Sequence, residues 1–423
     1  MKGKAELAPP ELGGSRSPSL RTRLALWTGG AAGWASRVTG RGAGVAISGR
    51  VALRMAPDAV RELARDQRIA IVSGTNGKTT TTRLLASCME GSGLQVETNA
   101  TGANLASGLI GALKRAQPAG VVILEVDEAV LPLVIGDLRP ETVVLTNLSR
   151  DQLDRFGEVR TVANRWRAAL ASQPGCRVVA NARDPMVVWA AGASRTIWVG
   201  AGSCLRADAA ACPQCGSLLA WDEERFQCTC GFGTPPLHSR LDGSTLRIGD
   251  EEVEVRLLLP GTWNVVNAAM ALTAASAMGV AAADGAAAMA RVATVGNRKV
   301  AWVLPDGTPA RLFLAKNPAG WTEVLRYLAG GSSDVVLAIN ARIADGRDPS
   351  WLYDVPFELL RGRRVVVSGE RALDMATRLR YGEVPCTIEP DPVRAGMLAG
   401  DGDVDICATY TAFTRLLKRL DRG

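Results

Sequence analysis

A glycine-rich loop that ends in Lys-Thr, residues 74–79, has the residue types of a phosphate-binding site. The apolar run 69–72 before it predicts a buried strand, and the apolar positions of 84–89 predict one face of a helix. In such a turn, backbone N–H groups and the helix N-terminus attract phosphate oxygens, Lys78 reaches the terminal phosphates and Thr79 binds Mg2+. The sequence therefore favours a nucleotide site over a glycine turn that only packs a strand on a helix.

The loop is shorter than the standard P-loop, whose first glycine would fall at Val72. Its pattern is Gly74-x-x-Gly77-Lys78-Thr79. The residues expected to bind ATP here are Gly74, Thr75, Asn76, Gly77, Lys78, Thr79 and Thr80.

Polar side chains follow the next predicted strands. Glu125 stands where a Walker-B-like carboxylate holds Mg2+ on the phosphates, although an acid at this place can also cap the next helix. For Asp127 and Glu128, capping is the favoured interpretation. Further polar residues at strand ends either line the nucleotide or cap helices, and they are Asn147, Asp151, Gln152, Asn181, Arg183 and Asp184.

Strands and helical segments alternate in two series, which predicts an α/β protein with a central parallel sheet and a smaller C-terminal α/β domain. The expected strands are 69–72, 121–126, 142–146 and 177–180 in the first series, and 311–314, 335–339, 364–367 and 405–408 in the second. The expected organisation is a basic lead-in segment (1–66), a central ATP-binding domain (67–295) and a C-terminal domain (296–423). Within the lead-in segment, 27–38 and 57–65 predict helices.

Four of the nine cysteines form two pairs, Cys212/Cys215 and Cys228/Cys230, and each pair is followed by glycine. Two such knuckles joined by a short hairpin suit a Zn2+ ion held by four thiolates, which is a closed and therefore structural site. The second pair is Cys-x-Cys, a tighter knuckle than usual. We expect a zinc-ribbon insertion at 204–235, with four unligated structural thiols as the alternative.

Two further stretches carry candidate site residues. Asn264 and Asn267 stand before an alanine-rich segment, 268–278, that predicts a helix, and their amides either face the nucleotide base or cap that helix. The segment 344–354 combines three carboxylates with Trp and Tyr. It predicts a partner surface or a catalytic loop, with a plain surface loop as the alternative.

Charge and composition narrow the class of function. Residues 1–68 carry twelve Lys or Arg against five acids, which accounts for the whole net charge of +7. This segment predicts a polyanionic partner, such as nucleic acid, anionic lipid or a pyrophosphate-bearing substrate, although residues 1–20 equally suit a disordered tail. The absence of a disulfide framework indicates a reducing cytoplasm, and no apolar run is long enough to span a bilayer.

His238 is the single histidine and lies just beyond the cysteine cluster. We therefore do not expect a Ser-His or Cys-His pair in the nucleotide cleft. If the reaction uses ammonia drawn from glutamine, a separate glutaminase must supply it.

These motifs together resemble the Mur ligase family, and within it the MurT-type ligase subunits of glutamine-hydrolysing lipid II isoglutaminyl synthases. The resemblance covers the chain from about residue 40 and rests on 74–80, 125–128, 146–154, the four cysteines, 259–261, Asn264, Asn267, 316–318 and 345–351. It implies that Lys78 and Thr79 bind ATP phosphates and Mg2+ and that Glu125 binds a Mg2+. It also implies that Asn264, Asn267 and Arg298 bind the nucleotide.

The resemblance implies phosphorylation of the α-carboxylate of D-glutamate in lipid II by ATP, followed by attack of ammonia to give D-isoglutamine. The reaction would take place at the inner face of the cytoplasmic membrane. Ammonia would come from a class-I-like glutaminase subunit in a heterodimer, whose Cys-His pair an aspartate of this chain completes. Asp348 is the expected aspartate, with Asp345 and Asp354 as rivals.

Two positions depart from the amino-acid-adding Mur ligases. Their metal-binding histidine corresponds to Gln152, and no lysine occurs between Lys114 and Lys299, where their carbamylated lysine is expected. An ammonia acceptor is consistent with this loss, because it needs no amino-acid pocket.

Two other functions remain open from the sequence. An amino-acid-adding ligase of the folylpolyglutamate synthetase type would turn over alone with a free amino acid. A zinc-ribbon P-loop protein would bind nucleic acid through its arginine-rich N-terminus with salt-sensitive affinity. The three acidic residues of the stretch 221–224, beside the cysteines, argue against nucleic acid as a partner.

Overall fold

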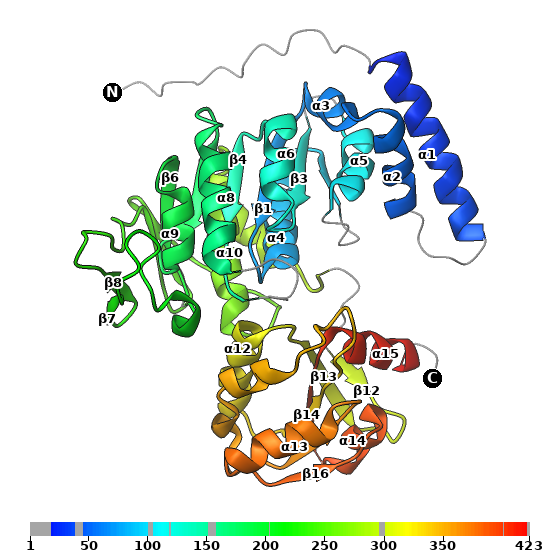
Figure 1. Ribbon diagram of the computed structural model, residues 1–423, viewed down its shortest axis with the longest axis vertical. Coiled ribbons are helices and arrows are strands. Elements are labelled where there is room, and N and C mark those ends of the chain that lie inside the picture. Colours follow the sequence, from blue (N-terminus) through cyan, green and yellow to red (C-terminus); the bar gives the residue numbers. More distant parts are fainter. Residues whose placement is uncertain are drawn as a thin grey trace.

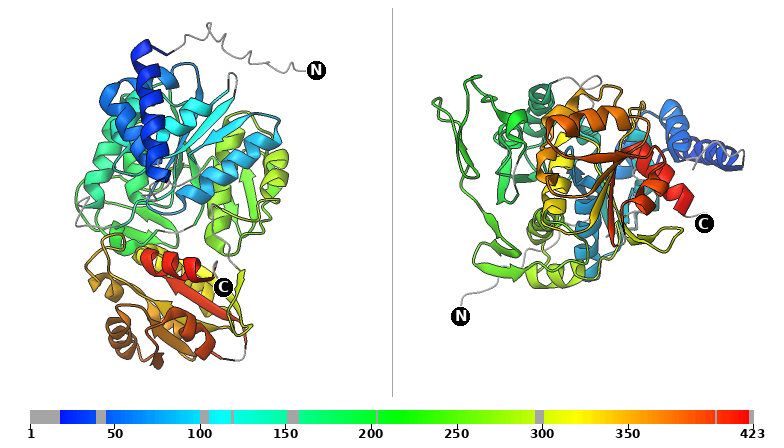
Figure 2. Two further views of the ribbon diagram at one scale, coloured as in Figure 1. Left: turned by 90° about the vertical axis from the view of Figure 1, so that its right-hand side faces the viewer. Right: turned by 90° about the horizontal axis from the view of Figure 1, so that it is seen from below.

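The computed structural model describes residues 18–38, 45–99, 105–117, 120–150, 158–202, 204–295, 301–400 and 402–420. Two sheets, each covered by helices on both faces, stack along the long axis of the molecule (Figures 1 and 2). The predicted α/β architecture with two sheets is confirmed.

The larger sheet has nine strands in the order β11-β10-β9-β6-β5-β4-β1-β3-β2. Neighbours from β9 to β2 pair in parallel, while β9, β10 and β11 form an antiparallel edge. The strands are β1 (Arg68–Ser73), β2 (Val96–Thr98), β3 (Val121–Glu125), β4 (Thr142–Leu145), β5 (Arg177–Asn181), β6 (Arg195–Gly200), β9 (Ser239–Asp242), β10 (Thr245–Ile248) and β11 (Glu251–Glu254). The four predicted strands of the first series are confirmed as β1, β3, β4 and β5.

Alternate residues of the central strands enter two separate apolar cores. In β1, Ile69 and Ile71 face one core, and Ala70 and Val72 face the other. The first core is covered by α5 (Ala106–Arg115), α6 (Leu131–Leu138), α8 (Val159–Ala171) and α9 (Pro185–Ala191), and the second by α4 (Lys78–Gly91), α10 (Thr262–Ala277) and α11 (Ala282–Met289).

The smaller sheet has the order β12-β13-β17-β14-β15-β16, with β12 as an antiparallel edge and the other strands parallel. Its strands are β12 (Ala301–Val303), β13 (Pro309–Leu314), β14 (Asp334–Ala338), β15 (Val365–Ser368), β16 (Cys386–Ile388) and β17 (Val404–Ala408). The helices are α12 (Pro318–Ala329) and α13 (Ala372–Tyr381) on one face, and α14 (Pro392–Leu398) and α15 (Tyr410–Leu420) on the other. The second predicted series is confirmed as β13, β14, β15 and β17.

In the described part of the N-terminal segment there are three helices, α1 (Leu20–Val38), α2 (Val45–Met55) and α3 (Ala59–Ala64). The sequence predicted helices at 27–38 and 57–65 but not α2, because glycine, serine and β-branched residues in 45–55 give it weak helix propensity. Packing against α5 stabilises this helix instead. A Cβ on Gly49 would lie 1.8 Å from the carbonyl oxygen of Ser107 on α5, so the two backbones are in contact. Among the described residues, no helix is both long and apolar enough to cross a bilayer.

Candidate active site

The turn between β1 and α4 is held open by two glycines in conformations that disfavour a side chain. Gly74 has φ +144° and Gly77 has φ +82°. A Cβ at Gly77 would lie 2.2 Å from Oδ1 of Asn267, and one at Gly74 would lie 2.1 Å from Oγ1 of Thr146. The N-cap residue of α4 is Gly77, which provides no side-chain cap, so the helix N-terminus is available for an anion.

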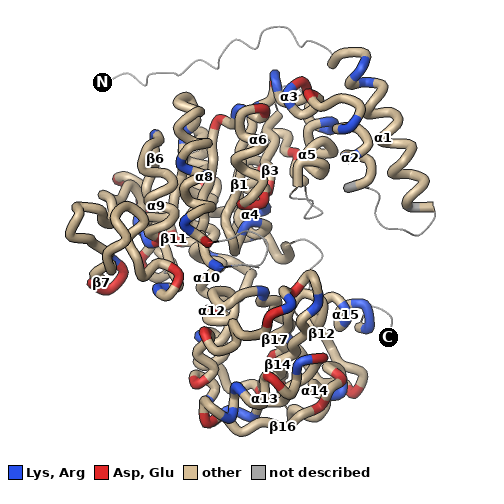
Figure 3. Tube along the Cα trace, in the orientation of Figure 1, with Lys and Arg blue, Asp and Glu red and all other residues tan. Residues whose placement is uncertain are grey.

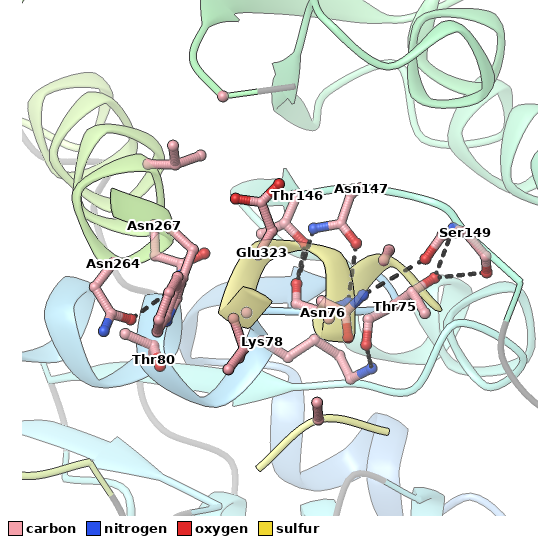
Figure 4. Close-up of a pocket in the computed structure, with 18 of the residues that line it drawn as sticks. Thr75, Asn76, Lys78, Thr80, Thr146, Asn147, Ser149, Asn264, Asn267 and Glu323 are labelled. Carbon is pink, nitrogen blue, oxygen red and sulfur yellow. Dashed lines mark hydrogen bonds between the residues drawn. The ribbon is translucent and has the colours of Figure 1, made fainter. Parts of the chain in front are cut away.

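The segment that follows β4 is hydrogen-bonded to this turn. The N–H groups of Thr75 and Asn76 donate to the backbone oxygen and to Oδ1 of Asn147, both at 2.9 Å. The hydroxyl of Thr146 donates to the Asn76 carbonyl at 2.9 Å, and the Ser149 N–H donates to Oγ1 of Thr75 at 3.0 Å (Figure 4). Thr146, Asn147 and Ser149 therefore fix the shape of the loop, in addition to lining the pocket beside it.

The side chain of Lys78 is only 10% exposed and pairs with Glu128, with Nζ 3.0 Å from Oε2. Nζ also donates to the carbonyl oxygens of Gly74 and Thr75. Burial acts to lower the pKa of Lys78, but the charges of Glu128, Asp127 and Glu125 outweigh burial and raise it. The lysine is thus held as a cation beside the phosphate-type turn.

The acids after β3 take different roles. Glu125 is 6% exposed, pairs in register with Val72 at the end of β1 and lines the cavity with Lys78 and Thr79. Asp127 accepts the N–H of Ala129, a local turn contact, and burial followed by the charge of Glu128 raises its pKa. The capping interpretation is therefore wrong for Glu128, whose carboxylate pairs with Lys78 rather than with a helix end.

Asn264 and Asn267 lie on the first two turns of α10, which begins at Thr262 instead of after Asn267. Gly261 is the N-cap residue of this helix, so neither asparagine caps it. Nδ2 of Asn264 donates to the carbonyl of Pro260 at 2.6 Å. Both asparagines line the cavity on the side of α4 (Figure 4).

The C-terminal domain closes the opposite side of this cavity, which has a volume of about 310 Å³. Asn76 of the turn and Asn317 exchange two amide hydrogen bonds, Nδ2 of each donating to Oδ1 of the other at 3.1 and 3.2 Å. Oδ1 of Asn317 also accepts the N–H of Gly320 at 3.0 Å and caps α12. Lys316 and Glu323 line the same cavity. The sequence singled out 316–318 as a motif but did not predict this contact with the turn.

The strand-end residues Asn181 and Asp184 line the cavity, and both also make local hydrogen bonds, whereas Arg183 is not among the lining residues. Oδ1 of Asn181 accepts the N–H of Arg183 at 2.9 Å, and Arg183 pairs with Glu224 at 2.8 Å. The carboxylate of Asp184 caps α9 through the N–H groups of residues 186 and 187 and accepts the N–H of Leu148 at 2.8 Å. Burial raises the pKa of Asp184 to about 6.

The three aspartates of 344–354 have different surroundings. Asp345 is buried and accepts the N–H groups of Thr411 and Arg342 at 2.7 and 3.1 Å. Asp354 pairs with Arg150 of the central domain at 3.1 Å. Asp348 is exposed, and within the described residues it accepts hydrogen bonds only from Ser350, at 2.9 Å from the N–H and 2.8 Å from the hydroxyl, which lower its pKa.

The four cysteines Cys212, Cys215, Cys228 and Cys230 come together, and all four sulfur atoms lie within 4.8 Å of one another. The separations of 3.7 Å (Cys212–Cys230) and 3.4 Å (Cys215–Cys228) are close to the edge of about 3.8 Å that a tetrahedron with Zn–S bonds of about 2.3 Å requires. The hairpin β7 (Ala220–Asp222) and β8 (Arg225–Gln227) joins the two pairs. Arg298, Asp151 and Gln152 lie outside the described residues.

Comparison with known proteins identifies the family. The Mur ligase middle domain model matches residues 72–275, and the MurT ligase C-terminal model matches residues 314–413. The lipid II isoglutaminyl synthase (glutamine-hydrolyzing) subunit MurT of Staphylococcus aureus (strain N315) is 31% identical, over 92% of this chain and 95% of that protein. The chain belongs to the MurT family. Its Streptococcus pneumoniae (strain ATCC BAA-255 / R6) member is 28% identical, over 87% and 88% of the two chains.

Solved structures agree with a MurT-family fold of the Mur ligase type. A pseudomurein peptide ligase type C from Methanothermus fervidus superposes with a TM-score of 0.69 at 17% identity, covering 88% of this chain and 84% of that one. A bifunctional folylpolyglutamate synthase/dihydrofolate synthase from Yersinia pestis gives 0.60 at 16% identity, covering 86% and 92%. At these identities the likeness establishes the shared α/β fold of both domains.

Proposed function

We propose that this chain is the ligase subunit of a glutamine-hydrolysing lipid II isoglutaminyl synthase. The observation that carries the proposal is an ATP-type turn facing an interdomain cavity, in a chain whose MurT relatives bear that name. The division into 1–66, 67–295 and 296–423 is part of the proposal, as is action at the inner face of the cytoplasmic membrane.

The residues of the turn would bind the triphosphate of ATP. The N-terminus of α4 and Lys78 would meet the phosphate oxygens, and Asn264 and Asn267, which line the same cavity from the neighbouring helix, would contact the nucleoside. Thr79 and Glu125 offer the hard oxygen ligands that Mg2+ prefers, and the ion shields phosphate charge when bound. Because Lys78 pairs with Glu128, phosphate binding exchanges one anionic partner of this lysine for another.

The reaction then has two steps. A carboxylate oxygen of the D-glutamate residue attacks the γ-phosphorus, the bond to the β–γ bridging oxygen breaks and ADP leaves. Ammonia attacks the carbonyl carbon of the acyl phosphate, loses a proton, and inorganic phosphate leaves with the former carboxylate oxygen. Lys78 and the backbone N–H groups stabilise the charge that develops on the transferred phosphoryl group.

Ammonia would come from a glutaminase partner, because the chain has a single histidine, His238. We assign Asp348 as the carboxylate offered to that partner, since Asp345 and Asp354 are engaged within the chain and Asp348 is exposed. The four cysteines would hold a structural Zn2+ ion, because four thiolates leave no open position for water.

The test assays the purified chain with lipid II, ATP and Mg2+, first with ammonium and then with glutamine. We expect amidated lipid II with ammonium, and with glutamine only after the glutaminase subunit is added. Use of glutamine by the chain alone overturns the two-subunit proposal, and use of a free amino acid supports the amino-acid-adding alternative.

Lys78→Ala should lower the ammonium-dependent rate at least about a hundredfold, because it removes a preorganised cation from the transferred phosphoryl group. Lys114→Ala is the matched control, since Lys114 is exposed on α5. A rate for Lys78→Ala equal to that of Lys114→Ala excludes the assigned role.

A further inference from the structure

Helix α1 turns its small side chains and Leu26 toward the protein and its other large apolar side chains toward solvent. Thr22, Ala25 and Ser36 are buried against the neighbouring helices. A Cβ on Gly29 would lie 2.5 Å from the carbonyl oxygen of Ser48 on α2, so small residues let the two backbones approach closely. The exposed large apolar residues, which we call the outer stripe, are Leu20 (81% exposed), Leu24 (56%), Trp27 (73%), Trp34 (63%) and Val38 (66%).

The outer stripe is continuous along the helix. Its members recur at intervals of four, three, seven and four residues, which places them on one face of an α-helix, and exposed Ala31 fills the longest interval. The stripe therefore runs along all 19 residues of α1. A contiguous exposed apolar surface of this kind marks an interaction site, because a soluble helix normally turns such a face to the core.

The position of α1 leaves this face unobstructed. Helix α2 packs between α1 and α5, so α1 forms the outermost layer at one edge of the central domain (Figures 1 and 2). The cavity that contains Lys78 lies on the side of the central domain that faces the C-terminal domain. A surface can therefore cover the outer stripe without entering the nucleotide site.

The charged side chains on α1 and α2 are all basic, and the acid beside the stripe is Glu62 of α3, which accepts hydrogen bonds from Ser19 at the start of α1. Neither α1 nor α2 contains an acidic residue (Figure 3). Arg21 and Arg23 on α1 and Arg50 and Arg54 on α2 are exposed. Arginines beside an apolar stripe with two tryptophans are the composition of a helix that lies in a bilayer interface. Anionic lipid headgroups attract such arginines, whereas a second copy of the same basic hairpin would be repelled.

We propose that the outer stripe of α1 docks this chain on the surface of a bilayer that contains anionic lipid. The helix lies in the interface plane with Trp27 and Trp34 among the headgroups and acyl chain boundary, and with the arginines over lipid phosphates. The biological role of docking rests on the proposed function, because docking would bring the chain to the bilayer that contains the lipid-linked acceptor. Docking itself requires neither ATP nor an acceptor.

The test is flotation of the full chain with phosphatidylcholine vesicles, with and without phosphatidylglycerol, in the absence of ATP. We expect binding to vesicles with phosphatidylglycerol that weakens as salt is raised. The double variant Trp27→Gln/Trp34→Gln should lose at least about tenfold in apparent affinity, and Arg23→Gln/Arg54→Gln should lose severalfold. Leu133→Gln/Leu218→Gln is the matched control, because these leucines are 78% and 81% exposed on other elements, and its affinity should equal that of the unchanged chain.

Three results would overturn the proposal. The first is that the tryptophan variant and the control bind vesicles with equal affinity. The second is that the unchanged chain is a dimer and the tryptophan variant is a monomer. The third is that the tryptophan variant no longer binds the glutaminase subunit. Ammonium-dependent amidation of a water-soluble acceptor separates this inference from the proposed function. If no variant amidates the acceptor but the chain still floats through Trp27 and Trp34, the function is wrong and the docking stands.

Discussion

At the scale of single residues, the charge state of each ionisable group in the site depends on the charges of its neighbours. Lys78 remains a cation because three carboxylates surround it, and Glu128 is the nearest of them. Sequence reasoning found Lys78 from the motif, but it underrated Glu128, because an acid after a strand caps a helix more often than it pairs with a loop lysine. Only the fold brings the two side chains together, fifty positions apart.

Asp348→Asn should leave the ammonium-dependent rate within about twofold and lower the glutamine-dependent rate of the complex by several orders of magnitude. The physical reason is that the amide cannot stabilise an imidazolium across the interface, as loss of a triad carboxylate costs about 10⁴ in rate. Asp354→Asn is the control, because Asp354 pairs with Arg150 within the chain. A loss confined to Asp354→Asn would assign the role to that residue instead.

Asp184 should make the stability of the chain depend on pH. Burial raises its folded-state pKa to about 6 from an ordinary value of 3.8, so the protonated carboxyl favours the folded state. This stabilisation, on the order of 3 kcal/mol, is complete below about pH 4 and is lost as the pH rises through about 6.

Melting temperatures between pH 4 and pH 7 test this expectation against Asp184→Asn. The variant loses one of the carboxylate's acceptors and should be less stable throughout, but its melting temperature should change less over this range. Parallel pH curves for the two proteins would show that Asp184 does not titrate there.

At the scale of elements, the strands that position the site were predictable, and several supporting elements were not. Strands β1, β3, β4 and β5 are buried on both faces and therefore read as short continuous apolar runs, the pattern that is typical of strands in a covered parallel sheet. Helix α2 was not predicted from the sequence, because its stability comes from close packing between α1 and α5. Strands β2 and β6 are partly exposed, so their runs are less apolar.

The cysteine insertion should carry one Zn2+ per chain. Cys215→Ser should abolish the bound zinc and lower the melting temperature, because binding of a structural ion contributes directly to folding. Cys386→Ser, in β16 and outside the cluster, is the control and should keep the metal. Metal analysis and thermal unfolding check both variants, and full zinc content in Cys215→Ser would refute a four-thiolate site.

At the scale of the whole molecule, the site exists only where two domains meet. Asn76 and Asn317 are 241 positions apart in the sequence, so no local sequence pattern predicts that their side-chain amides form a hydrogen-bonded pair. The motifs predicted which residues matter on each domain, whereas the contact between them depends on how the domains are placed. The same holds for Arg150 and Asp354, which join the domains at a second point.

Asn317→Ala should weaken the contact between the domains. It removes two neutral amide hydrogen bonds to Asn76, each worth about 0.5–1.5 kcal/mol, and should raise KM for ATP about fivefold or more. Small-angle scattering should show a more extended chain. Asp391→Ala is the control, because it removes the cap of α14 far from the interface. Equal scattering and equal KM in the two variants would refute a coupling role for the amide pair.

The central claim is that the γ-phosphoryl group of ATP is transferred to the acceptor carboxylate before nitrogen enters. Lipid II labelled with ¹⁸O in the D-glutamate α-carboxylate, incubated with the chain, ATP, Mg2+ and ammonium, tests this most directly. We predict one ¹⁸O atom transferred to inorganic phosphate for each amide formed. Amide formation with the label in AMP, or with unlabelled phosphate, would contradict the account.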